Sequence, residues 1–180
     1  MRHLAQSNEA EALYTKAERH ETVGELDEAE DLYRQFSDLL PDDPRGPNKL
    51  GVCQALRGQL DNAERFFQQA LALNPQYPPA LTNLGNILLE RHNLEGAVAK
   101  YEEALLHDPD YSPAHNNLAA ALKRMGQFQP AVQHLRQAHR SWRRQDRQRM
   151  RREAQGCTAR GTTVLVLASV GVLSLGVFWR

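Results

Sequence analysis

The sequence predicts an all-α protein: a right-handed α-solenoid of helical hairpins, followed by a single C-terminal transmembrane helix. Two observations lead to this prediction. Four stretches of the 180-residue chain align at one constant spacing without insertion, as residues 10–43, 44–77, 78–111 and 112–142. Residues 162–179 then form an uncharged run, followed by one arginine. A fixed period of about 34 residues is typical of stacked repeats, which serve as binding surfaces far more often than as enzymes.

Four columns of the 34-residue frame show the repeat most clearly: a small residue, a turn residue, a large ring and a closing proline. The small-residue column contains Ala29, Ala63, Ala97 and Ala131, and the turn column contains Gly24, Gly58, His92 and Gly126. The ring column contains Tyr33, Phe67 and Tyr101, with Leu135 in the fourth unit. The closing prolines are Pro41, Pro75 and Pro109. Alanine allows two helices to approach closely, because a larger side chain would overpack the contact. Glycine suits a turn with positive φ, so we expect a strained turn at His92.

Each unit is predicted to consist of two antiparallel helices, and the unit at residues 78–111 shows the pattern best. Apolar residues recur every three or four positions over residues 81–89 and again over residues 94–105, with a polar break between them. Pro109 then ends the second helix, because proline cannot continue a helix and restricts the residue before it. Residues 1–9 precede the first unit and are predicted to be an N-terminal extension.

The fourth unit, residues 112–142, departs from the pattern at its end. Arg143 stands where a proline closes the earlier units, so we expect the last helix to run on to about residue 154. Terminal elements of solenoids are often atypical. Residues 143–161 are predicted to form an arginine-rich helix or linker beside the membrane, and residues 162–179 the transmembrane helix. At about 1.5 Å per residue such a helix spans roughly 27 Å, close to the thickness of a bilayer core.

These columns resemble the tetratricopeptide repeat family over residues 10–142. The family signature requires apolar residues, glycine, alanine, an aromatic residue and proline at set intervals. The third unit supplies them as Leu81, Leu84, Gly85, Leu88, Ala97, Tyr101 and Pro109. The first unit has Lys16 where leucine is usual, and the fourth lacks the closing proline.

The resemblance implies that the first helices of the units line a concave groove that binds an extended peptide or a partner helix. The groove residues it implies are Tyr14, Asn48, Lys49, Asn83, Asn86, Asn116, Asn117 and Lys123. Asparagine amides can both donate to and accept from a peptide backbone. Asn83 and Asn117 share a column, so they are the predicted ladder for such a peptide. Solvated surface amides are the alternative interpretation.

One branch of the family clamps the C-terminal carboxylate of chaperones, and this sequence argues against that activity. The clamp needs two lysines, an arginine and two asparagines in set columns. Only Asn83 fits when the columns are counted from the second unit, and no residue fits when they are counted from the first. The charge-assisted hydrogen bonds that hold a carboxylate would be missing.

The net charge of zero hides two oppositely charged parts. Residues 1–135 carry 12 Lys and Arg against 20 Asp and Glu, whereas residues 136–180 carry 10 against 2. Such asymmetry indicates a membrane or a polyanion near the C-terminus. The arginines predicted to meet the membrane surface are Arg143, Arg144, Arg147, Arg149, Arg151, Arg152 and Arg160. Nucleic acid is disfavoured as the polyanion, because only Trp142 interleaves with the arginines as a stacking residue.

Positive residues beside a membrane helix remain on the cytoplasmic side, so the repeats are expected to face the cytoplasm. The predicted location is a single-pass membrane protein with a C-terminal anchor. The membrane would be the inner membrane of a bacterium or the outer surface of an organelle in a eukaryote.

No catalytic constellation is visible, so the protein is not predicted to be an enzyme, and we expect no cofactor and no metal. The seven histidines are scattered, and neither His-Glu-x-x-His nor Cys-x-x-Cys occurs. Cys53 falls on an apolar helix face and is predicted to be a core residue. Cys157, just before the uncharged run, is expected to be an inert thiol, with lipidation as the alternative.

The sequence therefore predicts a tail-anchored scaffold or adaptor that binds a protein or an extended peptide at the cytosolic face of a membrane. Two alternatives stay open. One is a self-assembling coat or fission-type adaptor, in which the groove takes the N-terminal segment of a neighbouring copy. The other is a non-catalytic subunit of a membrane complex.

Overall fold

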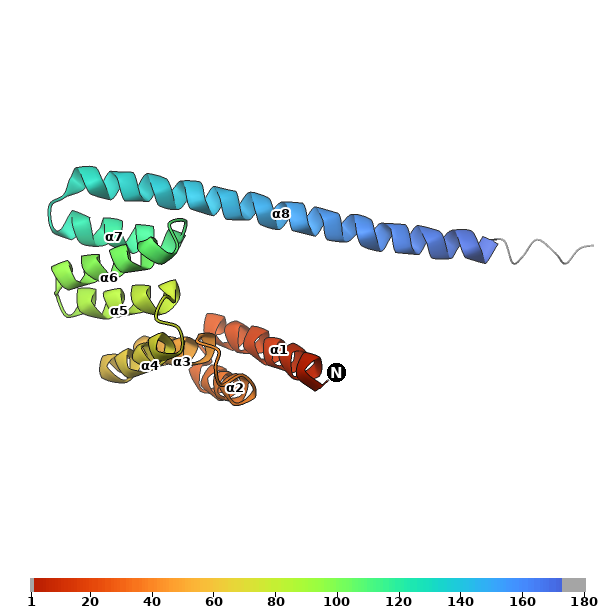
Figure 1. The fold of residues 1–180 in the computed structure, drawn as a ribbon, viewed down its shortest axis with the longest axis horizontal. Coiled ribbons are helices and arrows are strands. Elements are labelled where there is room, and N and C mark those ends of the chain that lie inside the picture. The colour runs from red at the N-terminus through yellow and green to blue at the C-terminus, as the bar shows by residue number, and fades with distance from the viewer. Residues whose placement is uncertain (1, 173–180) are drawn as a thin grey trace, which may run out of the picture. The chain divides into compact units, whose positions relative to one another are not determined.

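The computed structural model describes the backbone of residues 2–172 and the side chains of residues 6–152. Within these residues the regular elements are all α-helices. In chain order they are α1 (Arg2–Val23), α2 (Leu26–Leu39), α3 (Arg45–Leu56), α4 (Leu60–Leu73), α5 (Pro78–Glu90), α6 (Leu94–His107), α7 (Ser112–Arg124) and α8 (Phe128–Val172). Consecutive helices form antiparallel hairpins, as Figure 1 shows for α5 and α6, so the predicted all-helical solenoid is confirmed.

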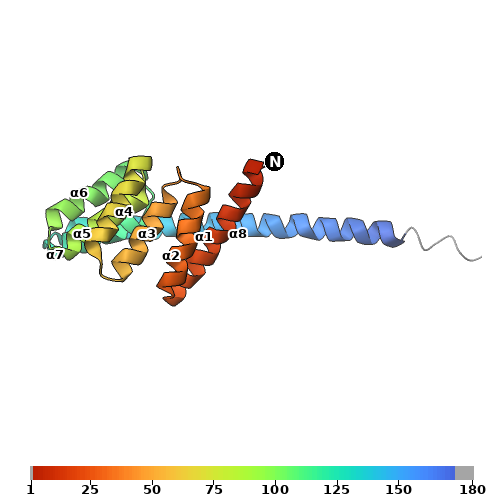
Figure 2. The same ribbon diagram turned by 90° about the horizontal axis from the view of Figure 1, so that it is seen from below.

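The chain divides into two compact units, one extending to Ala138 and one beginning at His139. In the first unit each hairpin packs on the next, through α2 with α3, α4 with α5 and α6 with α7 (Figure 2). The first helices also contact their nearest counterparts directly, α3 with α5 and α5 with α7. They therefore form one continuous face of this unit. The second unit is helical as far as Val172.

The turn column behaves as expected. Gly24, Gly58 and Gly126 have φ angles of +84°, +75° and +77° at the turns between the two helices of a hairpin. His92 adopts a φ of +60° at the equivalent turn, which confirms the expected strain. A side chain at positive φ costs roughly 1–2 kcal/mol, because its Cβ approaches the following carbonyl oxygen.

The small-residue columns hold the hairpins together. The four alanines of the alanine column are buried, three of them completely. Gly85 faces the ring of Tyr101 in the same hairpin, and a Cβ on Gly85 would lie only 2.4 Å from Cε1 of that ring. A Cβ on Gly51 would likewise lie only 2.5 Å from Cε1 of Phe67. These glycines therefore let an aromatic ring lie against the backbone of the first helix.

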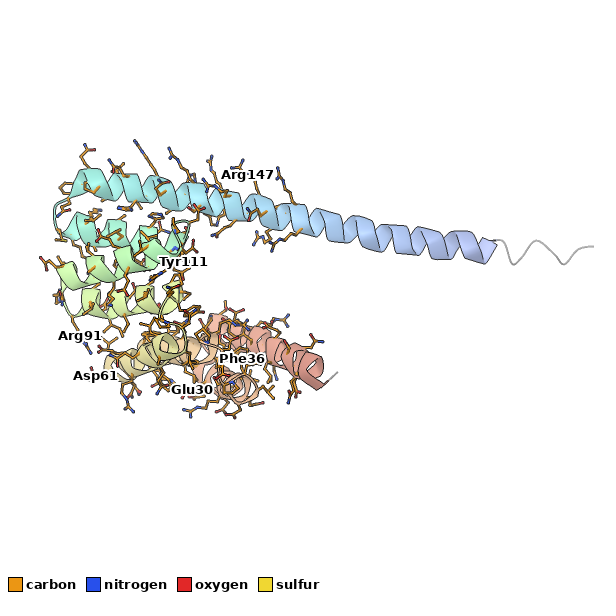
Figure 3. The ribbon with its side chains drawn as sticks, in the orientation of Figure 1. Glu30, Phe36, Asp61, Arg91, Tyr111 and Arg147 are labelled. Carbon is orange, nitrogen blue, oxygen red and sulfur yellow. The ribbon has the colours of Figure 1, made fainter. Side chains whose placement is uncertain are left out.

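Charged side chains join successive hairpins in a pattern that also repeats from one unit to the next. The ion pairs are Arg57 with Asp27 and Glu30, both at 2.5 Å, and Arg91 with Asp61 and Glu64, at 2.6 and 2.7 Å. Figure 3 shows Arg91 close to Asp61. Burial alone would raise the pKa of the Glu30 carboxyl, but hydrogen bonds from Arg34 and Arg57 lower it below its usual range. The residue pattern did not predict these ion pairs.

The predicted membrane anchor needs a correction. Along residues 2–172, none of the helices has both the length and the apolar character needed to cross a membrane. The predicted single-pass location, with repeats facing the cytoplasm, is therefore wrong on this evidence. Residues 173–179 of the predicted span lie outside the described residues.

The helices at the two ends of the repeat region extend beyond the repeat units themselves. Residues 2–9, predicted as an extension, are the first part of α1. The last helix continues beyond residue 154, since α8 is described as far as Val172. The absence of a closing proline at Arg143 explains why the helix does not stop there.

Candidate functional site

Next to the α3 end of the face formed by α3, α5 and α7, Tyr14 of α1 forms an aromatic cluster with two residues of α2. The ring of Tyr14 packs edge-on against Tyr33, with centroids 5.6 Å apart, and against Phe36 at 5.1 Å. The Arg45 guanidinium lies over the Tyr14 ring at 5.1 Å from its centroid. Burial raises the pKa of the Tyr14 hydroxyl, so this side chain is neutral at any physiological pH. Tyr14 therefore belongs to the core of the first repeat as well as to the predicted groove.

Lys49 lies beside this cluster, and carboxylates already compensate its charge. Its Nζ is 3.1 Å from the Glu21 carboxylate and 3.3 Å from that of Glu18. The hydroxyl of Tyr33 donates a hydrogen bond to the same Glu21 carboxylate at 2.5 Å. Arg45 is likewise paired, with Glu11 at 2.6 Å and Asp43 at 2.8 Å. These two cations are poorly placed to capture an acidic ligand.

The predicted asparagines come together as two hydrogen-bonded pairs. Nδ2 of Asn83 donates to Oδ1 of Asn48 at 3.0 Å, which links α5 to α3. Nδ2 of Asn117 donates to Oδ1 of Asn86 at 2.8 Å, which links α7 to α5. The hydroxyl of Tyr101 also donates to Oδ1 of Asn86, at 2.8 Å. The pairs use the amide nitrogens of Asn83 and Asn117, which leaves the carbonyl oxygens of both side chains as acceptors.

The other two predicted groove residues stand apart from these pairs. Asn116 and Lys123 are both exposed on α7. Lys123 lies in the last turn of that helix, where its charge suits the negative end of the helix dipole.

A hollow of about 480 Å³ opens between α3, α4 and α5. Most of its walls are apolar, and its polar groups are two side-chain amides and one carboxylate. The lining residues are Val52, Ala55, Leu56, Gly58, Leu60, Phe67, Asn83, Asn86, Ile87 and Glu90. The groove prediction named Asn83 and Asn86 but missed Ile87 and Glu90. Their positions in the 34-residue frame could have indicated them, because both lie near Asn83 and Asn86 on α5.

A histidine pair in the last hairpin also escaped sequence analysis. Nδ1 of His115 lies 3.0 Å from Nδ1 of His134, and Nε2 of His115 lies 3.0 Å from the carbonyl oxygen of Pro109. His115 is buried in the position that Leu81 occupies one unit earlier. This equivalence could have indicated the histidine pair, because a histidine in a buried leucine column needs a polar partner.

The arginines once assigned to a membrane surface lie on α8. Those with described side chains, Arg143, Arg144, Arg147, Arg149, Arg151 and Arg152, are exposed. Nε of Arg147 donates to the Arg143 carbonyl oxygen at 3.2 Å, and Arg149 pairs with Asp146 at 2.8 Å. The side chain of Arg160 lies outside the described residues, as does that of Cys157.

Reactive groups offer little basis for catalysis. Cys53 is completely buried, as predicted, and burial together with the nearby Glu21 and Glu30 charges raises the pKa of its thiol to about 11. A thiol protonated at neutral pH is a poor nucleophile. Among residues with described side chains, no group of three or more His, Cys, Asp or Glu is placed to hold a metal ion.

Comparison with known proteins places the fold. Family models described as "TPR repeat" and "Tetratricopeptide repeat" match residues 85–126, 54–99, 116–144 and 10–35. Together these ranges cover more than half of the chain. No curated protein matches the chain in sequence.

Several solved structures share the fold. The chain resembles MamA with 21% identity and a TM-score of 0.59, over 79% of this chain and 84% of that one. It resembles pilF of Pseudomonas aeruginosa with 20% identity and a TM-score of 0.67, over 77% and 64% of the two chains. The first TPR of Spaghetti (RPAP3), solved with the HSP90 peptide SRMEEVD, is 28% identical, with a TM-score of 0.57 over 67% and 95%.

One similar structure comes from an enzyme, the Thermobaculum terrenum O-GlcNAc transferase. It is 27% identical with a TM-score of 0.59 over 68% of this chain, but the match covers only 23% of the transferase. The repeat fold is in general a non-catalytic interaction fold. Four matching repeat models and a stack of helical hairpins identify this chain as a member of the tetratricopeptide repeat family.

Proposed function

We propose that this protein is a scaffold or adaptor that binds an extended peptide segment of a partner protein along α3, α5 and α7. The observation that carries the proposal is the hollow of about 480 Å³ between α3 and α5, beside the asparagine pairs. A bulky apolar side chain of the ligand would fill the hollow, and burying it contributes about 1.5–3 kcal/mol. The free carbonyl oxygens of Asn83 and Asn117 would accept hydrogen bonds from the ligand backbone.

The charges around this surface favour a particular class of peptide. Glu90 is the one charged residue among those that line the hollow. Lys49 and Arg45, nearer the N-terminal end, are already paired with carboxylates. The expected ligand therefore has a large apolar residue next to lysine or arginine. It differs in charge from the acidic HSP90 peptide bound to the similar Spaghetti structure.

The experiment is to pan a random peptide display library on the full chain and to measure the selected peptides by titration calorimetry. Enriched peptides should share a leucine, methionine or aromatic residue next to a basic residue. Val52→Lys replaces part of the apolar wall of the hollow with a cation that repels the basic residue of such peptides, so it should weaken their binding about tenfold or more. Asn83→Ala should weaken it less, by the roughly 0.5–1.5 kcal/mol of one hydrogen bond.

The matched control is Glu95→Ala, at an exposed position in the first turn of α6. It should bind the selected peptides like the wild type. Circular dichroism confirms that each variant remains folded. Selection of acidic peptides, or equal affinity of wild type and Val52→Lys, would contradict the proposal.

A further inference from the structure

One face of α8 is exposed although it is apolar. Phe128, Val132 and Leu135 are 63%, 44% and 50% exposed. They are four and three residues apart, so they lie on the same side of the helix. All three belong to the part of α8 that lies in the first unit. We call these three residues the end face.

The equivalent residues of the earlier repeats are covered. Leu135 stands in the ring column, where Tyr33, Phe67 and Tyr101 are at most 1% exposed. On α6, the counterparts of Phe128 and Val132 are Leu94 and Val98. These pack against a buried cluster to which Tyr101 on α6 and Leu118, Ala121 and Leu122 on α7 contribute. In this molecule the covering element is thus the first helix of the next repeat.

The structure therefore shows what kind of element fits such a face. The helix α7 presents apolar side chains at Leu118, Ala121 and Leu122, three or four residues apart. No helix follows α8 to perform this role within residues 2–172. From this we propose that the end face binds an amphipathic helix of a partner protein, whose apolar side is flanked by acidic residues.

The acidic flanks follow from the charges beside the end face. Residues 123–138 contain Lys123, Arg124 and Arg136 and neither Asp nor Glu. Carboxylates beside the apolar side of the partner helix would complement these charges and speed association. A basic helix would be repelled.

A second copy of this chain does not supply that helix. Among the described helices, α1 has no repeat packed before it, and it carries Lys16 and Arg19 where α7 has Leu118 and Ala121. Lys16 and Arg19 are exposed. Packing α1 of one copy on the end face of another would bring two cations against a cationic, apolar surface. Within the described residues, charged side chains are thus exposed at the N-terminal end of the stack, whereas the apolar end face is exposed at the other end.

The test uses the full chain and a fluorescein-labelled synthetic peptide of about 20 residues, which exceeds the length below which isolated helices are marginal in water. The peptide repeats the apolar spacing of α7 and carries glutamate at its remaining positions. Fluorescence anisotropy should show saturable binding to the wild type. Leu135→Asp should weaken binding about tenfold or more, since it places a carboxylate in the middle of the contact. Gln133→Asp makes the same charge change on another side of α8 and should alter affinity less than about twofold.

A second variant and a second peptide complete the test. Val132→Asp provides a second disruption of the end face, and circular dichroism establishes that both variants fold. A peptide with lysine in place of glutamate should bind at least about tenfold more weakly at low salt. Failure of the acidic peptide to bind, equal binding of the lysine peptide, or indifference to both aspartate variants would overturn the proposal. So would light scattering that finds a wild-type dimer and a Leu135→Asp monomer, because the occupant would then be a second copy.

Discussion

At the scale of single residues, the histidine pair of the last hairpin is the clearest titratable feature. The Pro109 carbonyl oxygen can only accept, so Nε2 of His115 carries a proton and donates to it. In this tautomer Nδ1 of His115 accepts from the Nδ1–H of His134. Burial lowers the pKa of His134, and a positive charge on His115 would lower it further, against the opposing effect of Glu102. The folded protein therefore favours a neutral His134.

This pair predicts a loss of stability in mild acid. In the unfolded chain His134 binds a proton near the ordinary pKa of 6.5, whereas in the folded chain it binds the proton only at a lower pH. The stabilisation is complete above about pH 6.5 and decreases as the pH falls from there toward the lowered pKa. His134→Asn keeps a donor near Nδ1 of His115 but cannot titrate, so its stability should depend less on pH.

Urea unfolding of both proteins between about pH 7.5 and about pH 5 measures this difference. If the wild type and His134→Asn lose stability in parallel over this range, other groups control the acid response. Gln133→Asn, a change at an exposed neighbouring position, is the control and should follow the wild type.

At the scale of helices, the contact between α5 and α6 depends on the absence of a side chain at Gly85. A Cβ there would lie 2.4 Å from Cε1 of Tyr101, much closer than a van der Waals contact. Tyr101 is completely buried, and its hydroxyl is fixed by Asn86 at 2.8 Å. The ring therefore has little freedom to move away.

We predict that Gly85→Ala destabilises the protein by about 1–3 kcal/mol, despite the higher helix propensity of alanine. Thermal unfolding of the full chain measures the change. Combined with Tyr101→Leu, the glycine substitution should cost less than it does alone, because the overlapping ring atoms are gone. Additive costs in the double variant would mean that Gly85 is needed for another reason.

At the scale of the whole molecule, stability should vary along the stack. Hairpins α3–α4 and α5–α6 have neighbours on both sides, whereas α1–α2 has one. In the second unit, residues 143–152 are almost all exposed on a polar helix, and isolated helices of this kind are marginal in water. Repeat proteins open locally, in units that follow these contacts.

Hydrogen exchange followed by mass spectrometry should show this gradient in the full chain. We expect the slowest exchange in α3 to α6 and much faster exchange over residues 143–152 and the first turns of α1. Among the described helices, no preceding repeat packs against the first turns of α1. Uniform protection from α1 through residue 152 would contradict the prediction and would mean that the chain opens as one cooperative unit.

The sequence by itself determined the fold, because a 34-residue period records the same packing environment in every unit. It placed the end of α6 before Pro109, the burial of Ala97 and the left-handed turn at His92. These are local properties of helices and turns, which residue type controls directly. The same local pattern could not establish a membrane location, and that prediction was wrong.

Tertiary structure alone decided which side chains meet across helices. Periodicity put Asn83 and Asn117 in one column, but packing joined each to a different asparagine of the preceding first helix. Packing also paired Lys49 with Glu18 and Glu21, and it placed His134 beside His115. Such contacts depend on side-chain rotamers and on the angle between helices, which a pattern of residue types does not specify. The exposed end face of α8 depends likewise on which helix is absent beside it within the described residues.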